Sequence, residues 1–151
     1  MTVTFKSATA SDADALTELM REFYAHEHLD YDEAAAGRAL EQLLADDRAG
    51  RVWLIQNGDS PQIGYVVLTF GFSLEFHGRD AFVDELYVRA NYRGQGIGTK
   101  ALKFVEDACR SLGIPALHLE VDRENLRAQS VYRSFGFRDH DRYLMTKWVT
   151  T

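Results

Sequence analysis

Cysteine, proline and long hydrophobic runs are all scarce in this sequence. Cys109 is the only cysteine, so an internal disulfide is excluded, which is typical of a cytoplasmic protein. No apolar run approaches the roughly 18 residues that a membrane-spanning helix needs, so we expect no membrane partner. Residues Met1–Ser7 contain no apolar stretch that would predict a secretory signal. With two prolines, 151 residues and no linker-like segment, the chain is expected to form a single domain over 1–151.

Positive charge is also in short supply. The net charge of −6 argues against nucleic acid as the main partner. Residues 1–48 contain 11 acidic and four basic side chains, whereas residues 49–151 contain 12 acidic and 13 basic ones. The acidic N-terminal third fits either solvated helix faces or a field that attracts a cationic substrate.

Hydrophobic periodicity predicts a mixed α+β fold with helices on the faces of a sheet. Alternating or continuous apolar segments predict strands near 3–5, 51–56, 62–72, 81–89 and 116–121, and two more short strands at the end of the chain. Helical spacing predicts helices after Ser11, after Asp32, over 98–112 and after Asn125, with Gly113 ending the third. Trp53 and Trp148 are expected in the core.

A glycine-rich turn separates the 81–89 strand from the next helix. In Gly94-x-Gly96-x-Gly98, glycines would let an anion approach backbone N–H groups, and the helix N-terminus adds partial positive charge. The P-loop and the dinucleotide fingerprint both fail, because Thr99 stands where each requires glycine. By itself the turn could also be a tight strand-to-helix connection.

The segment Arg93–Gly98 resembles the acetyl-coenzyme A motif, Arg/Gln-x-x-Gly-x-Gly/Ala, of the GCN5-related N-acetyltransferase (GNAT) superfamily. Asp84–Val88 resembles the fourth strand of that family, and Asn125, Ala128, Tyr132 and Phe135–Phe137 resemble its Asn…Ala…Tyr…Gly-Phe signature. The resemblance covers nearly the whole chain. The acidic pair is similar to that of the diamine and polyamine acetyltransferases, with the two acids in exchanged order.

The resemblance implies a GNAT-like αβα fold, with a mostly antiparallel sheet of six to seven strands and four helices on its faces. It also implies acetyl-CoA as co-substrate, no metal, and a homodimer. Backbone groups of the segment Leu86, Tyr87 and Val88 would pair with the pantetheine arm. The residues that would wrap the pyrophosphate are Arg93, Gly94, Gln95, Gly96, Ile97, Gly98 and Thr99. Asn125 and Ala128 would flank the pantetheine, and Tyr132 would lie near the sulfur.

Acetyl transfer to an amine first needs a neutral nitrogen. An alkyl amine with a pKa of ~10.4 is mostly protonated at pH 7, and deprotonating it costs roughly 4 to 5 kcal/mol. Asp84 and Glu85 are the candidate proton acceptors. As neighbours in a strand they would point to opposite faces unless a bulge intervenes. The resemblance favours Asp84 for a water-linked proton path and Glu85 for contact with the amine.

The reaction also needs support for the oxyanion and for the leaving thiolate. The resemblance implies the backbone N–H of Val88 for the first role. It implies Tyr132 for the second, although full proton transfer from tyrosine (~10) to thiolate (~8.5) is uphill by roughly 2 kcal/mol. Tyr132 could instead supply only a hydrogen bond, or be a core residue.

The acceptor is the least determined part of the reaction. His26 and Tyr31 lie between the first two helices, a region that borders the acceptor cleft in the family, so they are candidate substrate-binding residues together with Glu85. The sequence thus predicts an acetyl-CoA-dependent N-acetyltransferase that acts on a primary amine, favouring a small cationic one, by direct attack in a ternary complex. Aminoglycoside or protein-amine acetylation, and a non-catalytic acyl-CoA-binding module, remain alternatives.

Overall fold

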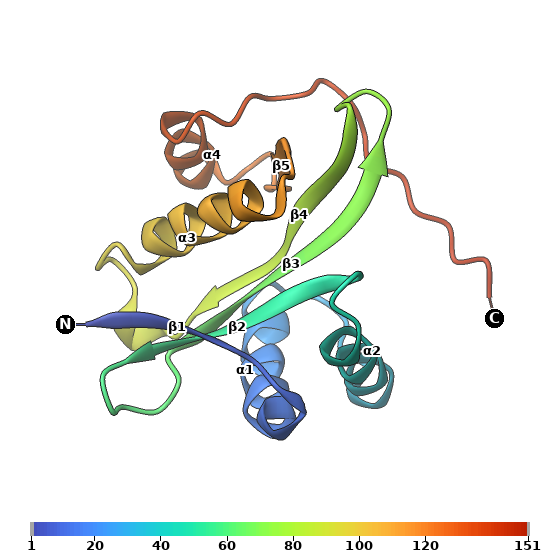
Figure 1. The fold of residues 1–151 in the computed structure, drawn as a ribbon. Helices are drawn as coiled ribbons and strands as arrows, with labels where there is room; N and C mark the ends of the chain where they lie inside the picture. Colours follow the sequence, from blue (N-terminus) through green and yellow to red (C-terminus); the bar gives the residue numbers. More distant parts are fainter. Residues whose placement is uncertain (1, 151) are drawn as a thin grey trace. The chain divides into compact units, whose positions relative to one another are not determined.

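The computed structural model describes residues 2–150 (Figure 1). Its elements in chain order are β1 (Val3–Ser7), the 3₁₀ helix η1 (Ala10–Asp12), α1 (Ala13–His26), α2 (Glu33–Ala45), β2 (Gly50–Asn57), β3 (Gly64–Ser73), β4 (Gly78–Val88), the 3₁₀ helix η2 (Ala90–Tyr92), α3 (Ile97–Leu112), β5 (Ala116–His118) and α4 (Leu126–Ser134). The α+β class and the four α-helices are confirmed over this part of the chain.

The expected number of strands is wrong. Five strands form the sheet within residues 2–150, not six or seven, and no helix or strand follows α4 in the described residues. The apolar residues that predicted two final strands are largely exposed, Met145 by 89% and Trp148 by 86%. Without a neighbouring strand to complete their backbone hydrogen bonds, these residues form no ladder. The expectation that Trp148 lies in the core is therefore also wrong.

The chain divides into two compact units, the first ending at Leu119 and the second beginning at Glu120. The first unit contains the sheet with α1, α2 and α3, and the second contains α4. The expectation of one domain over 1–151 stays a prediction.

The sheet of the first unit has the strand order β1-β2-β3-β4-β5. Successive pairs from β1 to β4 are antiparallel, and β5 is parallel to β4. Helices α1 and α2 cover one face, and α3 covers the other (Figure 1). The expected mostly antiparallel sheet with helices on its faces is confirmed.

The helix ends follow local sequence signals. The Asp32 side chain accepts a hydrogen bond of 3.0 Å from the Ala35 N–H and so caps α2. Gly113 ends α3 in the left-handed conformation, with φ of 71°. The Asn125 side chain accepts a 3.1 Å hydrogen bond from the Ala128 N–H at the start of α4. All three residues were expected at helix ends.

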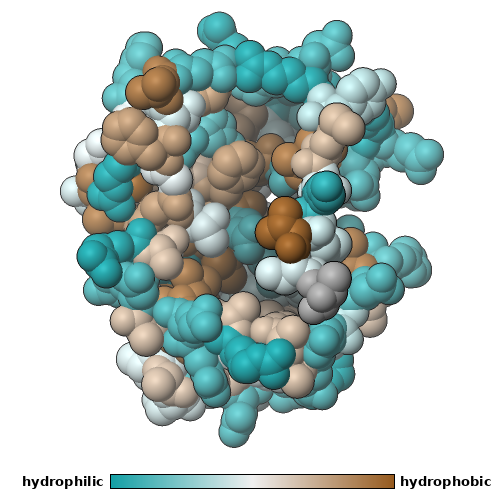
Figure 2. Space-filling view, turned by 90° about the vertical axis from the view of Figure 1, so that its right-hand side faces the viewer, coloured by the Kyte–Doolittle hydropathy of each residue, from teal (hydrophilic) through white to brown (hydrophobic). Residues whose placement is uncertain are grey.

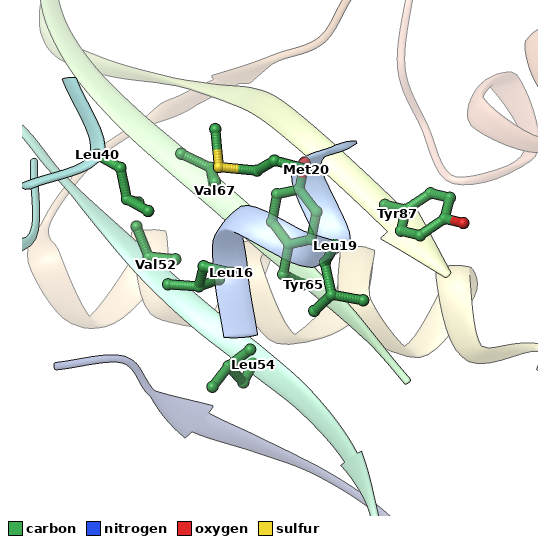
Figure 3. Packing of buried hydrophobic residues seen from close by; sticks show 9 residues of the cluster. All are labelled: Leu16, Leu19, Met20, Leu40, Val52, Leu54, Tyr65, Val67 and Tyr87. Atoms are coloured by element: carbon green, nitrogen blue, oxygen red, sulfur yellow. The ribbon is translucent and has the colours of Figure 1, made fainter. Parts of the chain in front are cut away.

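Each face of the sheet carries its own hydrophobic core. The core under α1 and α2 is shown in Figure 3, where Tyr65 of β3 and Tyr87 of β4 stand among aliphatic side chains. The core under α3 includes Trp53, which is 8% exposed as expected, and Cys109. Alternate residues of β4 enter opposite cores. A shift of one residue in the pairing of β4 would therefore move its side chains from one core to the other.

Hydrophobic side chains also reach the surface, as the brown residues among teal ones in Figure 2 show. The most exposed in the first unit include Phe72 and Leu74 near the tip of the β3–β4 hairpin. Within residues 2–150, none of the helices combines the length and the apolar character needed to cross a membrane.

Candidate active site

A bulge in β4 places two acidic side chains on the same face of the sheet. Val67 of β3 pairs with Glu85, but the next residue, Leu68, pairs with Val83, so Asp84 is an extra residue in β4. Val83 packs in the core under α3, whereas the charge of Asp84 acts on the Tyr24 hydroxyl of α1 and helps to raise its pKa, so Asp84 turns toward α1. Glu85 also faces α1, where it meets Tyr24. The bulge that would bring both carboxylates to one face is therefore present.

Two tyrosine hydroxyls hold the Glu85 carboxylate. Tyr65 donates to Oε1 at 2.7 Å, and Tyr24 of α1 donates to Oε2. The Tyr65 side chain is completely buried, whereas that of Tyr24 is partly buried. Since each oxygen of Glu85 already accepts a hydrogen bond, the carboxylate has a fixed orientation. Its remaining lone pairs can still accept from a ligand.

Burial raises the pKa of both carboxyl groups. For Glu85, removal from water raises the pKa, and hydrogen bonds from Tyr24 and Tyr65 oppose this increase. For Asp84, loss of surrounding water alone raises the pKa. Asp84 nevertheless remains exposed to solvent. Asp84 is therefore a carboxylate that solvent or a ligand can reach.

Tyr31 completes an aromatic group beside the carboxylates. Its ring lies 5.0 Å from the Tyr24 ring, measured between centroids. Burial raises the pKa of the Tyr31 hydroxyl, and the charges of Glu33 and Glu85 add to this increase. The structure thus brings Tyr31, one of the expected substrate-binding residues, to the same side of the sheet as Glu85.

One edge of β4 is left without a neighbouring strand. Strand β5 pairs only with Asp80–Phe82, and the segment 83–88 has β3 on its other side. In the described part of the chain no strand pairs with the outer edge of this segment. Backbone groups there can bond an extended ligand as an added strand. This arrangement fits the expected pantetheine contacts of Leu86 and Val88, which stay a prediction, as does the oxyanion role of Val88.

The glycine turn leads from this edge to the start of α3. Gly94 and Gly96 have φ of 75° and 78°, in the left-handed region where a side chain would be strained. The first hydrogen bond within α3 runs from the Lys100 N–H to the Gly96 carbonyl at 3.1 Å. The N–H groups of the first turn therefore have no partner within the helix, and no side chain of the described residues caps it.

The start of α3 fits an anionic group. A Cβ atom added to Gly98 would meet no atom within 4 Å, so space is open beside the backbone. The side chain of Ile97 is only 2% exposed and anchors the turn in the core, so only its backbone can face a ligand. Free N–H groups, open space and the helix dipole together suit a pyrophosphate.

Arg93 and His26 lie beside this turn. Arg93 Nε donates to the Val88 carbonyl at 2.8 Å, and its guanidinium lies 5.4 Å from the centre of the Tyr87 ring. Its Nη1 is 3.5 Å from His26 Nε2. The structure therefore places His26, expected near the acceptor, in contact with a residue expected to hold the coenzyme.

The other expected site residues, Asn125, Ala128 and Tyr132, belong to the second unit. Asn125 and Ala128 bond to each other at the start of α4, and the ring of Tyr132 packs edge-on against that of Phe137, at 6.1 Å between centroids. Their roles toward the coenzyme stay predictions. Over residues 2–150, no group of three or more His, Cys, Asp or Glu side chains is arranged to hold a metal ion.

Two contacts of the site were not predicted from the sequence, the bonds of Tyr24 and Tyr65 to Glu85. Tyr65 lies in an apolar strand, where a tyrosine indicates only packing, and the pairing of β3 with β4 decides that it meets Glu85. Tyr24 lies 61 residues from Glu85 in sequence. The sequence signal for these partners was an acidic residue within an apolar strand. A carboxylate that is buried there needs hydrogen-bond donors from other side chains.

This fold and site define a member of the acetyltransferase (GNAT) family, whose model matches residues 13–137, and the chain belongs to that family. Thialysine N-epsilon-acetyltransferase of Bos taurus is 36% identical over 77 residues, which are 51% of this chain and 45% of that protein. The match therefore spans less than half the length of that relative. Streptothricin acetyltransferase of Streptomyces lavendulae is 24% identical over 90% of this chain and 82% of its own length.

Solved structures share the fold over nearly the whole chain. The integron cassette protein HFX_CASS3, from the mobile metagenome of Cole Harbour Salt Marsh, is 37% identical, with a TM-score of 0.84 over 97% of this chain and 91% of that one. A predicted acetyltransferase from Clostridium acetobutylicum, solved with acetyl-CoA, has a TM-score of 0.81 at 18% identity over 97% of this chain and 96% of its own. At that identity the second likeness concerns the fold alone.

Proposed function

We propose that this protein is an acetyl-CoA-dependent N-acetyltransferase that acetylates the primary amine of a small cationic molecule. The observation that carries the proposal is the β4 bulge, which turns Asp84 and Glu85 to one face beside a strand edge that leads to the uncapped start of α3. The names of the relatives also support amine acetylation, because they specify thialysine and streptothricin as substrates of those proteins.

Residues of the first unit would hold the coenzyme along β4 and α3. The backbone of Leu86 and Val88 would bond the pantetheine arm, and the turn from Arg93 to Thr99 would hold the pyrophosphate through N–H groups. Bound acetyl-CoA would supply the acetyl thioester. The family resemblance assigns further coenzyme contacts to Asn125, Ala128 and Tyr132.

The two carboxylates would have different tasks. Asp84 has an accessible carboxylate, so it would take the proton of the acceptor ammonium, directly or through water. Glu85 is fixed by Tyr24 and Tyr65, so it would orient the cationic group by charge. The neutral nitrogen would then bond to the acetyl carbon as the carbon–sulfur bond breaks, and the second proton that it loses in becoming an amide would pass to water. Tyr132 would donate a proton or a hydrogen bond to the leaving sulfur.

The proposal is tested by following the release of free thiol from acetyl-CoA with a panel of amines. Saturable turnover with putrescine or spermidine is the expected result, with mass spectrometry showing one added acetyl group. Turnover only with an aminoglycoside or a protein amine would replace the small-amine acceptor. Coenzyme binding without turnover on any amine would indicate a non-catalytic acyl-CoA-binding module. We also propose a cytoplasmic homodimer, which light scattering of the purified protein and localisation of a tagged chain would test.

A further inference from the structure

The guanidinium of Arg93 is held at three points. Its Nε donates to the Val88 carbonyl at 2.8 Å, its central carbon lies over the Tyr87 ring at 5.4 Å from the centroid, and its Nη1 lies 3.5 Å from His26 Nε2. Because an arginine side chain has donors and no acceptor, the His26 nitrogen is the acceptor in this last contact. All four residues belong to the first unit.

The ring under Arg93 is itself fixed by α1. The Tyr87 hydroxyl donates to Glu22 Oε1 at 3.0 Å, and Arg89 Nη2 donates to Glu22 Oε2, also at 3.0 Å. Glu22 and His26 are about one helical turn apart in α1, so they lie on the same face of that helix. Two successive turns of α1 therefore fix both the ring on which Arg93 rests and one end of its guanidinium.

Stability alone gives little reason to hold this side chain in place. Arg93 and His26 are both exposed, and ordering a long side chain at the surface costs conformational entropy. The guanidinium is held at the point where β4 turns into the glycine segment 94–98 and the uncapped start of α3. It has five N–H donors, so several remain for an anion after its bonds to Val88 and His26. A cation that is ordered in advance binds an anion at a lower entropic cost.

We propose that His26 is a positioning residue, which holds the Arg93 guanidinium on the Tyr87 ring for contact with the coenzyme pyrophosphate. This inference rests on the proposed function, because it concerns the coenzyme site of the same reaction. It assigns His26 to coenzyme binding and not to the acceptor. His26 acts through Arg93, so its loss should weaken coenzyme binding by about three- to tenfold, the contribution of one hydrogen bond.

The test compares two amide side chains that differ in reach. In His26→Gln the amide oxygen can take the place of the imidazole Nε2, whereas the shorter amide of His26→Asn reaches only the place of Nδ1. Calorimetric titration of the full-length protein with coenzyme A should give a parent-like dissociation constant for His26→Gln and one about three- to tenfold higher for His26→Asn. Pantetheine, which lacks the pyrophosphate, should bind the parent and both variants equally.

The matched control is His77→Asn. His77 is also exposed and lies in the turn between β3 and β4, where asparagine tolerates its φ of 69°. Its coenzyme A affinity should equal that of the parent. A second readout is the NMR signal of the Arg93 Nε–H in the protein without coenzyme, assigned by its absence in Arg93→Lys. This signal should be unchanged in His26→Gln and shifted in His26→Asn, because the guanidinium then moves relative to the Tyr87 ring.

Equal coenzyme A affinity of the parent and His26→Asn would overturn the role of His26, as would a parent protein that does not bind coenzyme A. An equal loss in both His26 variants, or the same loss for pantetheine, would also overturn it, because a structural role predicts that pattern. An unshifted Arg93 signal in His26→Asn would show that His26 does not hold the guanidinium. These measurements need no acceptor. Failure of the proposed function would appear separately, as the absence of thiol release with every amine.

Discussion

The hydroxyl of Tyr65 donates a 2.7 Å hydrogen bond to the Glu85 carboxylate from a side chain that is completely buried. The two residues lie on neighbouring strands, where Val67 pairs with Glu85 two residues along from Tyr65, so both side chains lie on the same face of the sheet. The alignment of β3 with β4 therefore determines which hydroxyl bonds the charged Glu85 carboxylate of the candidate active site.

Tyr65→Phe should destabilise the protein in a pH-dependent way. The Tyr65 hydrogen bond favours ionised Glu85 and lowers its pKa, so its removal should raise that pKa further. The variant should then lose stability, relative to the parent, as pH rises from the raised pKa of Glu85 in the parent to its still higher pKa in the variant. The loss should reach about 1.5–3 kcal/mol at pH 8, the contribution of a hydrogen bond to a charged group.

Urea denaturation of parent and variant at pH 4 and pH 8 measures this difference, with Tyr143→Phe as the control, because Tyr143 is 83% exposed. Because Phe keeps the ring, packing changes little. A loss of stability of equal size at both pH values would show that Glu85 ionisation is not involved.

Asp84→Asn should remove the proton acceptor of the proposed reaction. We expect kcat to fall by about 10²- to 10⁴-fold, the usual contribution of general acid–base catalysis. In the parent, the pH profile of kcat/KM should fall on the acidic side with an apparent pKa above the ordinary aspartate value of about 3.9, because burial raises the pKa of Asp84. In Asp84→Asn this acidic decrease should disappear. Glu85→Gln should instead raise KM for the amine more than it lowers kcat. If Glu85→Gln alone abolished the acidic decrease, the two assignments would be exchanged.

Gly98→Ala should separate coenzyme binding from stability. Gly98 and Gly37 both lie in α-helices, and a Cβ atom at either would meet no atom within 4 Å. Alanine favours a helix over glycine by up to about 1 kcal/mol, so neither change should destabilise the protein. Only at Gly98 would the methyl group occupy the space where we expect the pyrophosphate. Acetyl-CoA affinity should fall at least tenfold for Gly98→Ala and stay constant for Gly37→Ala, and equal affinities would argue against a phosphate site at α3.

The Asp80–His118 pair should be important for joining β5 to β4. Asp80 Oδ2 lies 3.1 Å from His118 Nε2, and the two side chains are only 10% and 15% exposed. The rings of Phe76 and Phe82 both pack against the His118 ring, at 4.5 and 4.9 Å between centroids. His118→Ala would leave a buried carboxylate unpaired, so we expect a loss of about 3–5 kcal/mol in the free energy of unfolding. A double-mutant cycle with Asp80→Ala measures the coupling, and additive losses would contradict a direct interaction.

Much of the fold and half of the site could be predicted from local sequence. Asp32, Gly113 and Asn125 act at helix ends through their own side chain or backbone freedom, so residue type alone indicated their place. The glycine turn and the adjacent acidic residues were likewise visible as short motifs. These features depend on contacts within a few residues.

The remaining features depend on long-range pairing. The bulge at Asp84 is decided by how β3 and β4 align, and the bond from Tyr24 to Glu85 joins a helix to a strand far along the chain. The error on the final strands has the same origin. An apolar segment such as Tyr143–Met145 has strand-like composition, but a strand forms only where an edge is available to pair with it.

Tyr132→Phe should lower kcat with little change in acetyl-CoA affinity. The proposed task of its hydroxyl is to assist the leaving thiolate, a contact that becomes strong only as the carbon–sulfur bond breaks, so its loss should affect turnover and not ground-state binding. Because transfer of a full proton from tyrosine (~10) to thiolate (~8.5) is uphill by roughly 2 kcal/mol, we expect a decrease in kcat of about tenfold to hundredfold, typical of a lost hydrogen bond. Steady-state kinetics at saturating amine, with Tyr143→Phe as control, measures kcat, and calorimetry measures the affinity. A parent-like kcat would assign Tyr132 to packing against Phe137, the contact that the phenylalanine ring retains.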